Sequence, residues 1–86
     1  MRIFTHRNFD KAYIKLRYGE KSRFKERRNL FLVGPFHPAL NNHALKGKYT
    51  GYRSINIGGD LRTIFKMLDE ETAIFMDIDT HPNLYE

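Results

Sequence analysis

The chain of 86 residues has no cysteine, no tryptophan and only three prolines. Without cysteine, neither a disulfide framework nor a thiolate metal site can form. Uninterrupted apolar runs reach only four residues, as at 30–33, far short of the roughly 20 that a membrane span requires. The first residues lack the apolar segment of a signal peptide. These absences favour a soluble, cytoplasmic protein without a membrane partner.

What is present is a globular composition. Hydrophobic residues make up 41% of the chain and aromatic residues 14%, which is too apolar for a disordered chain. Two domains of this total length would each be too small to bury an adequate core. We therefore expect a single domain over residues 1–86.

Positive charge is concentrated in the first third of the chain. Residues 1–33 hold ten Lys/Arg and three Asp/Glu, a net charge of +7, whereas residues 34–86 hold five and seven, a net charge of −2. Such a field attracts a phosphate polymer or an acidic protein. It is also compatible with the solvated face of ordinary helices, so charge alone does not decide for nucleic acid.

The spacing of apolar residues predicts the elements. Residues 2–5 resemble a short strand, and Phe9, Ala12, Tyr13 and Leu16 follow the i, i+3, i+4, i+7 pattern of an amphipathic helix. Gly19 is expected to end that helix, and a second helix is expected from about residue 20 to 33, forming a helical hairpin with the first. Residues 34–46, rich in Pro and Asn, are expected to form a loop, and a loop this long is often functional.

The second half of the chain favours strands. Residues 52–57, 61–68 and 72–78 are strand-like and are separated by polar turns at 58–60 and 69–71. The expected fold class is α+β with the order β-α-α-β-β-β, an antiparallel sheet with the helical hairpin packed on one face.

Several polar residues fall at strand ends and in loops. His43 ends the long loop, Asp60 and Arg62 begin one strand, and His81 and Tyr85 follow the last one. Because the start of 61–68 and the end of 72–78 share one edge of an antiparallel sheet, Asp60 and Arg62 are expected near His81. Such a set is suited to metal-free RNA cleavage. This reaction requires a base for the 2′-OH proton, an acid for the leaving oxygen and a cation for the charge on the phosphoryl group.

Other chemistries have weaker support. The four histidines show no paired metal-ligand spacing, and neither a phosphate-binding glycine loop nor a nucleophile elbow occurs. We therefore expect no metal and no cofactor. Taken singly, His43 and His81 are more often surface histidines, Asp60 a turn residue and Tyr85 a packing aromatic. Arg62, within an apolar strand, is harder to dismiss because a charge there needs a partner or a substrate.

Three segments resemble a known family. Residues 43–54 (HALKGKYTGYRS) are similar to the H-x-L-x-G-x-x-x-G-Y-R signature of YafQ-like toxins, residues 60–66 (DLRTIFK) to their D-x-R-x-I-[FY]-K strand, and residues 80–85 (THPNLY) to their closing T-H-x-x-[LV]-[YF]. The chain is thereby identified as resembling the RelE/ParE superfamily, and it resembles the YafQ branch most. At three positions it departs from that branch: Asn56 replaces a histidine, Asp77 lies near the position of an arginine, and Leu61 replaces a tryptophan.

The resemblance implies a RelE-like fold and the toxin of a type II toxin–antitoxin pair. Such toxins are ribosome-dependent mRNA interferases that cut mRNA in the ribosomal A site and are neutralised by a cognate antitoxin. The implied catalytic residues are His43, Asp60, His81 and Tyr85, with Arg62 stabilising the transition state. We also assign RNA binding to Lys46, Lys48, Arg53 and Asn56.

Two other readings stay open at this point. The chain could bind RNA or the ribosome without cutting, or it could act on another target, such as gyrase, as ParE toxins do. Those toxins usually lack the His-Asp-His set, which ranks this reading last.

Overall fold

A computed structural model describes residues 1–84. Two helices come first after a short strand: β1 (Arg2–Thr5), α1 (Arg7–Ile14) and α2 (Tyr18–Val33). The 3-10 turn η1 (Pro38–Leu40), the two-residue strand β2 (His43–Ala44) and a second 3-10 turn η2 (Gly47–Tyr49) follow. The chain then runs through β3 (Arg53–Gly58), β4 (Leu61–Asp69), β5 (Thr72–Thr80) and the short helix α3 (His81–Leu84).

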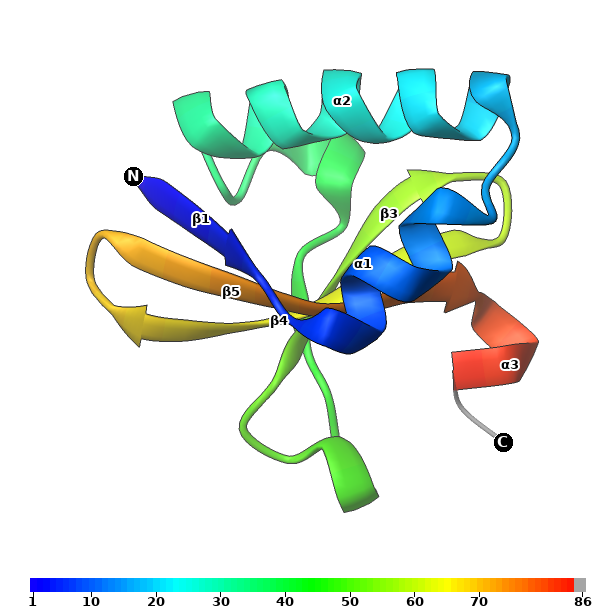
Figure 1. The fold of residues 1–86 in the computed structure, drawn as a ribbon. Coiled ribbons are helices and arrows are strands. Elements are labelled where there is room, and N and C mark those ends of the chain that lie inside the picture. The colour runs from blue at the N-terminus through cyan, green and yellow to red at the C-terminus, as the bar shows by residue number, and fades with distance from the viewer. Residues whose placement is uncertain (85–86) are drawn as a thin grey trace.

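The five strands form one sheet in the order β1-β5-β4-β3-β2. Strands β2 to β5 are antiparallel to their neighbours, whereas β1 runs parallel to β5 and pairs with residues 72–75. Figure 1 shows α2 lying across one side of this sheet, while the β2–β3 connection projects on the other side. Because β1 pairs only with residues 72–75, the C-terminal half of β5 forms an edge of the sheet on that side. Helix α1 packs against β5.

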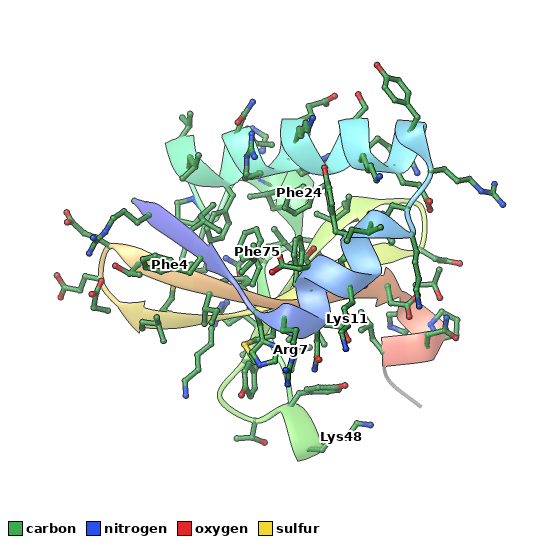
Figure 2. The ribbon with its side chains drawn as sticks, in the orientation of Figure 1. Phe4, Arg7, Lys11, Phe24, Lys48 and Phe75 are labelled. Carbon is green, nitrogen blue, oxygen red and sulfur yellow. The ribbon has the colours of Figure 1, made fainter. Side chains whose placement is uncertain are left out.

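The core lies between the sheet and the two long helices. Phe75 of β5 is fully buried, and its ring centroid lies 5.9 Å from Phe9, 5.9 Å from Phe24 and 5.5 Å from Phe31. In Figure 2, Phe24 and Phe75 face each other across this layer. The aromatic residues of α1, α2 and β5 thus close one continuous core on a single face of the sheet.

The α+β class, the element order and the packing of both helices on one face are confirmed. The expectation of a wholly antiparallel sheet is wrong for β1, because the chain returns through helices before β5 and a parallel pair needs such a crossover. Gly19 does not end the first helix. It is the second residue of α2, while α1 ends at Ile14.

The segment 34–46 is more ordered than a loop. It contains η1 and the edge strand β2, and Leu40 within it is fully buried. The helix after β5 was also not anticipated. No helix among residues 1–84 is long and apolar enough to cross a membrane.

Candidate functional site

Side chains alternate between the two faces of a strand. Residues next to a core residue in the sequence therefore lie on the opposite face of the sheet. Ile55, Thr63 and Ile78 are register partners on the core side. Their neighbours in sequence therefore point to the side away from α2, which we call the open face. It carries Ser54, Asn56, Arg62, Ile64, Asp77 and Asp79.

A polar strip crosses this open face. Asn56 of β3, Arg62 of β4 and Asp79 of β5 are successive register partners. His43 of the edge strand β2 pairs with Ser54, two residues before Asn56, and so it lies on the same face. We use the term polar strip for these four residues: His43, Asn56, Arg62 and Asp79.

Arg62 lies at the centre of the polar strip and is half-buried. Its Nη1 donates hydrogen bonds to Gly59 O at 2.7 Å, to Asn56 Oδ1 at 3.0 Å and to Leu61 O at 3.1 Å. All of its hydrogen bonds within residues 1–84 use this one nitrogen, so the Nε and Nη2 groups remain as donors for an anion. A guanidinium held in this way is suited to a phosphate.

Asp60 and His81 lie side by side at one end of the polar strip. The His81 backbone N–H donates to Asp60 O at 2.7 Å, and Leu61 pairs with Thr80. The expected proximity of Asp60 to His81 is therefore correct. Both residues are exposed, so a large substrate can reach them. Tyr85, the remaining residue expected here, lies outside the described residues.

His43 lies at the other end, separated from β5 by β3 and β4. Its ring Nδ1 lies 2.8 Å from Asn41 O. Because a carbonyl oxygen can only accept, Nδ1 must carry the proton, and in the neutral ring Nε2 is then the basic nitrogen. The two histidines thus flank Arg62 rather than contact each other.

The four residues assigned to RNA binding do not lie together. The Arg53 side chain turns to the core side, where its Nε donates to Asn42 Oδ1 at 2.7 Å and its guanidinium lies 5.2 Å from the Phe36 ring centroid. This arrangement fixes the segment after α2. Lys46 and Lys48 belong to the projecting β2–β3 connection, and Figure 2 shows Lys48 and Arg7 extending on the side away from α2.

Asn56 is a partner of Arg62. Its Oδ1 accepts from Arg62 Nη1 and also from the Gly58 backbone N–H at 2.9 Å. The amide cannot exchange a proton, but it holds the guanidinium and the bulged end of β3 in place. Asn56 therefore positions a functional group of the polar strip.

Two carboxylates of the open face, Asp79 in the polar strip and Asp77 beside it, were not among the sequence-predicted site residues. Asp79 Oδ1 accepts from Thr80 N at 2.7 Å and from Asn83 Nδ2 at 3.2 Å, and so links the end of β5 to α3. Burial raises the pKa of the Asp77 carboxyl, the Ile78 N–H bond opposes that rise, and the Asp79 charge adds to it. Two aspartates spaced by two in an apolar strand were the available signal, since that spacing places both on one face.

Among residues 1–84, no three His, Asp or Glu side chains are arranged to hold a metal ion. Figure 2 shows Lys11 and Arg7 on the same helix α1, which packs against β5. The open face and its surroundings offer imidazole, carboxylate, guanidinium and ammonium groups.

The fold is shared with solved toxin structures. Over the full length of both chains, the protein superimposes with a TM-score of 0.79 and 23% identity on YafQ from Escherichia coli. A chain of the DinJ–YafQ complex from the same organism gives a TM-score of 0.75 at 25% identity, again over the full length of that chain and of this protein. The archaeal RelE–RelB complex from Pyrococcus horikoshii gives 0.74 at 21% identity over 93% of each chain.

No protein-family model and no curated protein sequence matches the chain. The similarity to known proteins is therefore structural. It confirms that the fold is the one expected from the resemblance to YafQ-like toxins of the RelE/ParE superfamily.

Proposed function

We propose that this chain, which has the RelE-like toxin fold, is the toxin of a type II toxin–antitoxin pair and a ribosome-dependent endoribonuclease that cuts mRNA. The observation that carries the proposal is the position of Arg62 in the polar strip, between His43 on β2 and His81, which follows the end of β5. In-line cleavage needs a base on one side of the phosphate and an acid on the other, because the attacking and leaving oxygens lie on opposite sides of the phosphorus. A cognate antitoxin is the expected protein partner, as DinJ is for YafQ and RelB for RelE in the similar complexes.

The proposed reaction begins at His43. Its Nε2 removes the proton of a ribose 2′-OH, and the 2′-oxygen attacks the adjacent phosphorus. The bond from phosphorus to the 5′-oxygen breaks as His81 donates a proton to that oxygen, which leaves a 2′,3′-cyclic phosphate. Protons and electron pairs balance without a metal ion, and each positioned acid or base typically contributes about 10²–10⁴-fold in rate.

The other residues support these steps. Arg62 donates from Nε and Nη2 to the phosphoryl oxygens, where negative charge develops in the transition state. Asn56 holds the Nη1 side of that guanidinium. Asp60, whose backbone carbonyl oxygen accepts from the His81 N–H, places a carboxylate next to the proposed acid.

His81→Ala tests the proposal. Cleavage of ribosome-bound mRNA, mapped by primer extension, should fall by about 10²–10⁴-fold while the circular dichroism spectrum stays unchanged. His37→Ala is the matched control, because His37 is an exposed histidine that caps η1 in the loop after α2. Full cleavage by the His81 variant would show that another residue donates the proton.

The rival readings have their own outcomes. A chain that binds ribosomes and arrests translation without producing cut mRNA would be a non-catalytic toxin. Growth arrest with intact mRNA and inhibited gyrase would indicate ParE-like action. Metal independence is tested by substituting sulfur for a non-bridging oxygen of the scissile phosphate: Mn²⁺ should not restore cleavage of the substituted RNA.

A further inference from the structure

A hollow of about 250 Å³ lies on the open face beside the polar strip. Its floor is apolar and is formed by Ile64 and Met76, and its wall consists of Tyr49 and Tyr52. Asn8 of α1 and Asp77 of β5 contribute polar groups. The volume is below the roughly 300–1,000 Å³ of sites for drug-sized ligands, so the hollow suits a single planar ring system.

The surroundings of the hollow favour a nucleotide. The two tyrosine rings are nearly perpendicular, with centroids 6.4 Å apart, and aromatic rings are the usual platforms for unstacked RNA bases. Lys48 Nζ lies 5.2 Å from the Tyr49 centroid and Lys66 Nζ 5.7 Å from that of Tyr52. Ammonium groups next to an aromatic wall provide for the phosphates on either side of an inserted base.

The hollow is also at the right distance from the proposed chemistry. Ile64 and Asp77 are register partners, as are Arg62 and Asp79 two residues further along the same strands. Two residues of a strand span about 7 Å. A nucleotide whose phosphate is held by Arg62 can therefore place a neighbouring base in the hollow.

Asp77 determines which base fits. Its Oδ1 already accepts the Ile78 N–H at 2.8 Å, but each carboxylate oxygen has two lone pairs, so the group can still accept two more bonds side by side. It is acceptor-only when ionised. Of the four RNA bases, only guanine presents two adjacent donors, N1–H and the N2 amino group, to such a group.

The other bases are disfavoured by the same geometry. Adenine and cytosine place a ring-nitrogen lone pair next to their amino group, and uracil places carbonyl oxygens on both sides of its N3–H. Each would bring a lone pair against the carboxylate. The amide of Asn8, on the same hollow, can donate to guanine O6.

We propose that the hollow formed by Tyr49, Tyr52, Ile64, Met76, Asn8 and Asp77 is a nucleobase pocket that selects guanine next to the cleaved bond. The inference rests on the proposed function, in that the ligand is RNA. A well-formed bidentate pair is worth about 1–3 kcal/mol of discrimination. Guanine should therefore be preferred by roughly tenfold or more over each other base.

The experiment measures binding without cleavage. The labelled full-length chain is titrated with guanosine, adenosine, cytidine and uridine 5′-monophosphates, and amide chemical shifts are followed by NMR. Guanosine monophosphate should shift the signals of Ile64 and Asp77 and bind about tenfold more tightly than the others. Equal affinity for all four nucleotides, or shifts confined to other residues, would overturn the proposal.

Variants separate recognition from folding. Asp77→Asn should abolish the preference for guanine, and Asn8→Asp, on the exposed first turn of α1, should weaken it by facing O6 with an acceptor. Asp69→Asn, a matched change at the last residue of β4 and outside the hollow, should keep it. A preference that survives in both Asp77→Asn and Asn8→Asp would refute the assignment.

The two proposals fail separately. Guanine-selective binding without any RNA cleavage would support the pocket and reject the nuclease. Cleavage without a guanine preference at any fixed position beside the cut, together with equal nucleotide affinities, would support the nuclease and reject the pocket.

Discussion

Replacing Asn56 by alanine tests how the polar strip holds Arg62. The amide oxygen Oδ1 is the shared acceptor of two donors, the Gly58 backbone N–H at 2.9 Å and Arg62 Nη1 at 3.0 Å. Alanine removes both hydrogen bonds without removing either donor. The Gly58 N–H is then left at the end of β3, where the strand bulges and the register with β4 shifts.

The size of the effect follows from these two bonds. A neutral hydrogen bond contributes about 0.5–1.5 kcal/mol and one to a charged group about 1.5–3 kcal/mol. Both bonds are only partly buried, so the lower ends apply and their sum is about 2 kcal/mol. For a domain of this size, such a loss lowers the melting temperature by roughly 8–16 °C.

Urea unfolding followed by circular dichroism measures the loss directly. Asn56→Asp retains an acceptor at the same position and should recover most of the stability. Lys25→Ala, at an exposed site on α2, is the control and should change the stability by no more than about 0.5 kcal/mol.

A double-mutant cycle with Arg62→Ala isolates the pair. Residues in contact usually show coupling energies of about 0.5–3 kcal/mol, and about 1 kcal/mol is expected here. Coupling near zero, or an Asn56→Asp variant as unstable as Asn56→Ala, would refute the idea that Asn56 positions Arg62.

Three further predictions follow from the packing and the charges. Asp77→Asn should stabilise the protein at neutral pH: burial raises the folded-state pKa of Asp77 above the ordinary 3.8, so stability is lost as pH rises from 3.8 through the folded-state value. Urea unfolding should show the variant's advantage at neutral pH, and this advantage should shrink as the pH falls through the folded-state pKa toward 3.8; an advantage independent of pH would exclude this cause. Phe75→Ala should cost about 3–5 kcal/mol, because Phe75 lies under three helical aromatics; in the same unfolding assay Phe4→Ala, at a 51% exposed site, should cost far less. Arg53→Ala should lower the free energy of unfolding by about 2 kcal/mol through the lost Asn42 bond, and it should leave RNA affinity unchanged. Reduced RNA affinity at full stability would instead support the assignment of Arg53 to RNA binding.

Local sequence patterns were sufficient for much of the fold. The strand at 2–5 and the long helix ending at Val33 lie where the spacing of apolar residues predicts them. The strands after residue 52 are also correct, because a period of two and polar turns are local signals. The end of the first helix was misplaced because Gly19, a residue that often ends helices, is tolerated in the first turn of α2.

The candidate site was predictable where it depended on strand order. Antiparallel pairing of the two long strands is enough to bring Asp60 next to His81, and the structure has this arrangement. The side-chain direction of Arg53 was not predictable. It depends on Phe36 and Asn42, which come from a segment that appeared from its sequence to be an unstructured loop.

The sequence by itself determined the class of fold, the concentration of positive charge and the set of imidazole, carboxylate and guanidinium groups. These properties depend on composition and on periodicities that neighbouring residues create. Only the tertiary structure decided that β1 is parallel to β5, that Asn56 holds Arg62, and that Asn8 and Asp77 meet Tyr49 and Tyr52 around one hollow. Contacts of this kind join residues far apart in the chain, and their geometry is fixed by the packing of the whole core rather than by any local pattern.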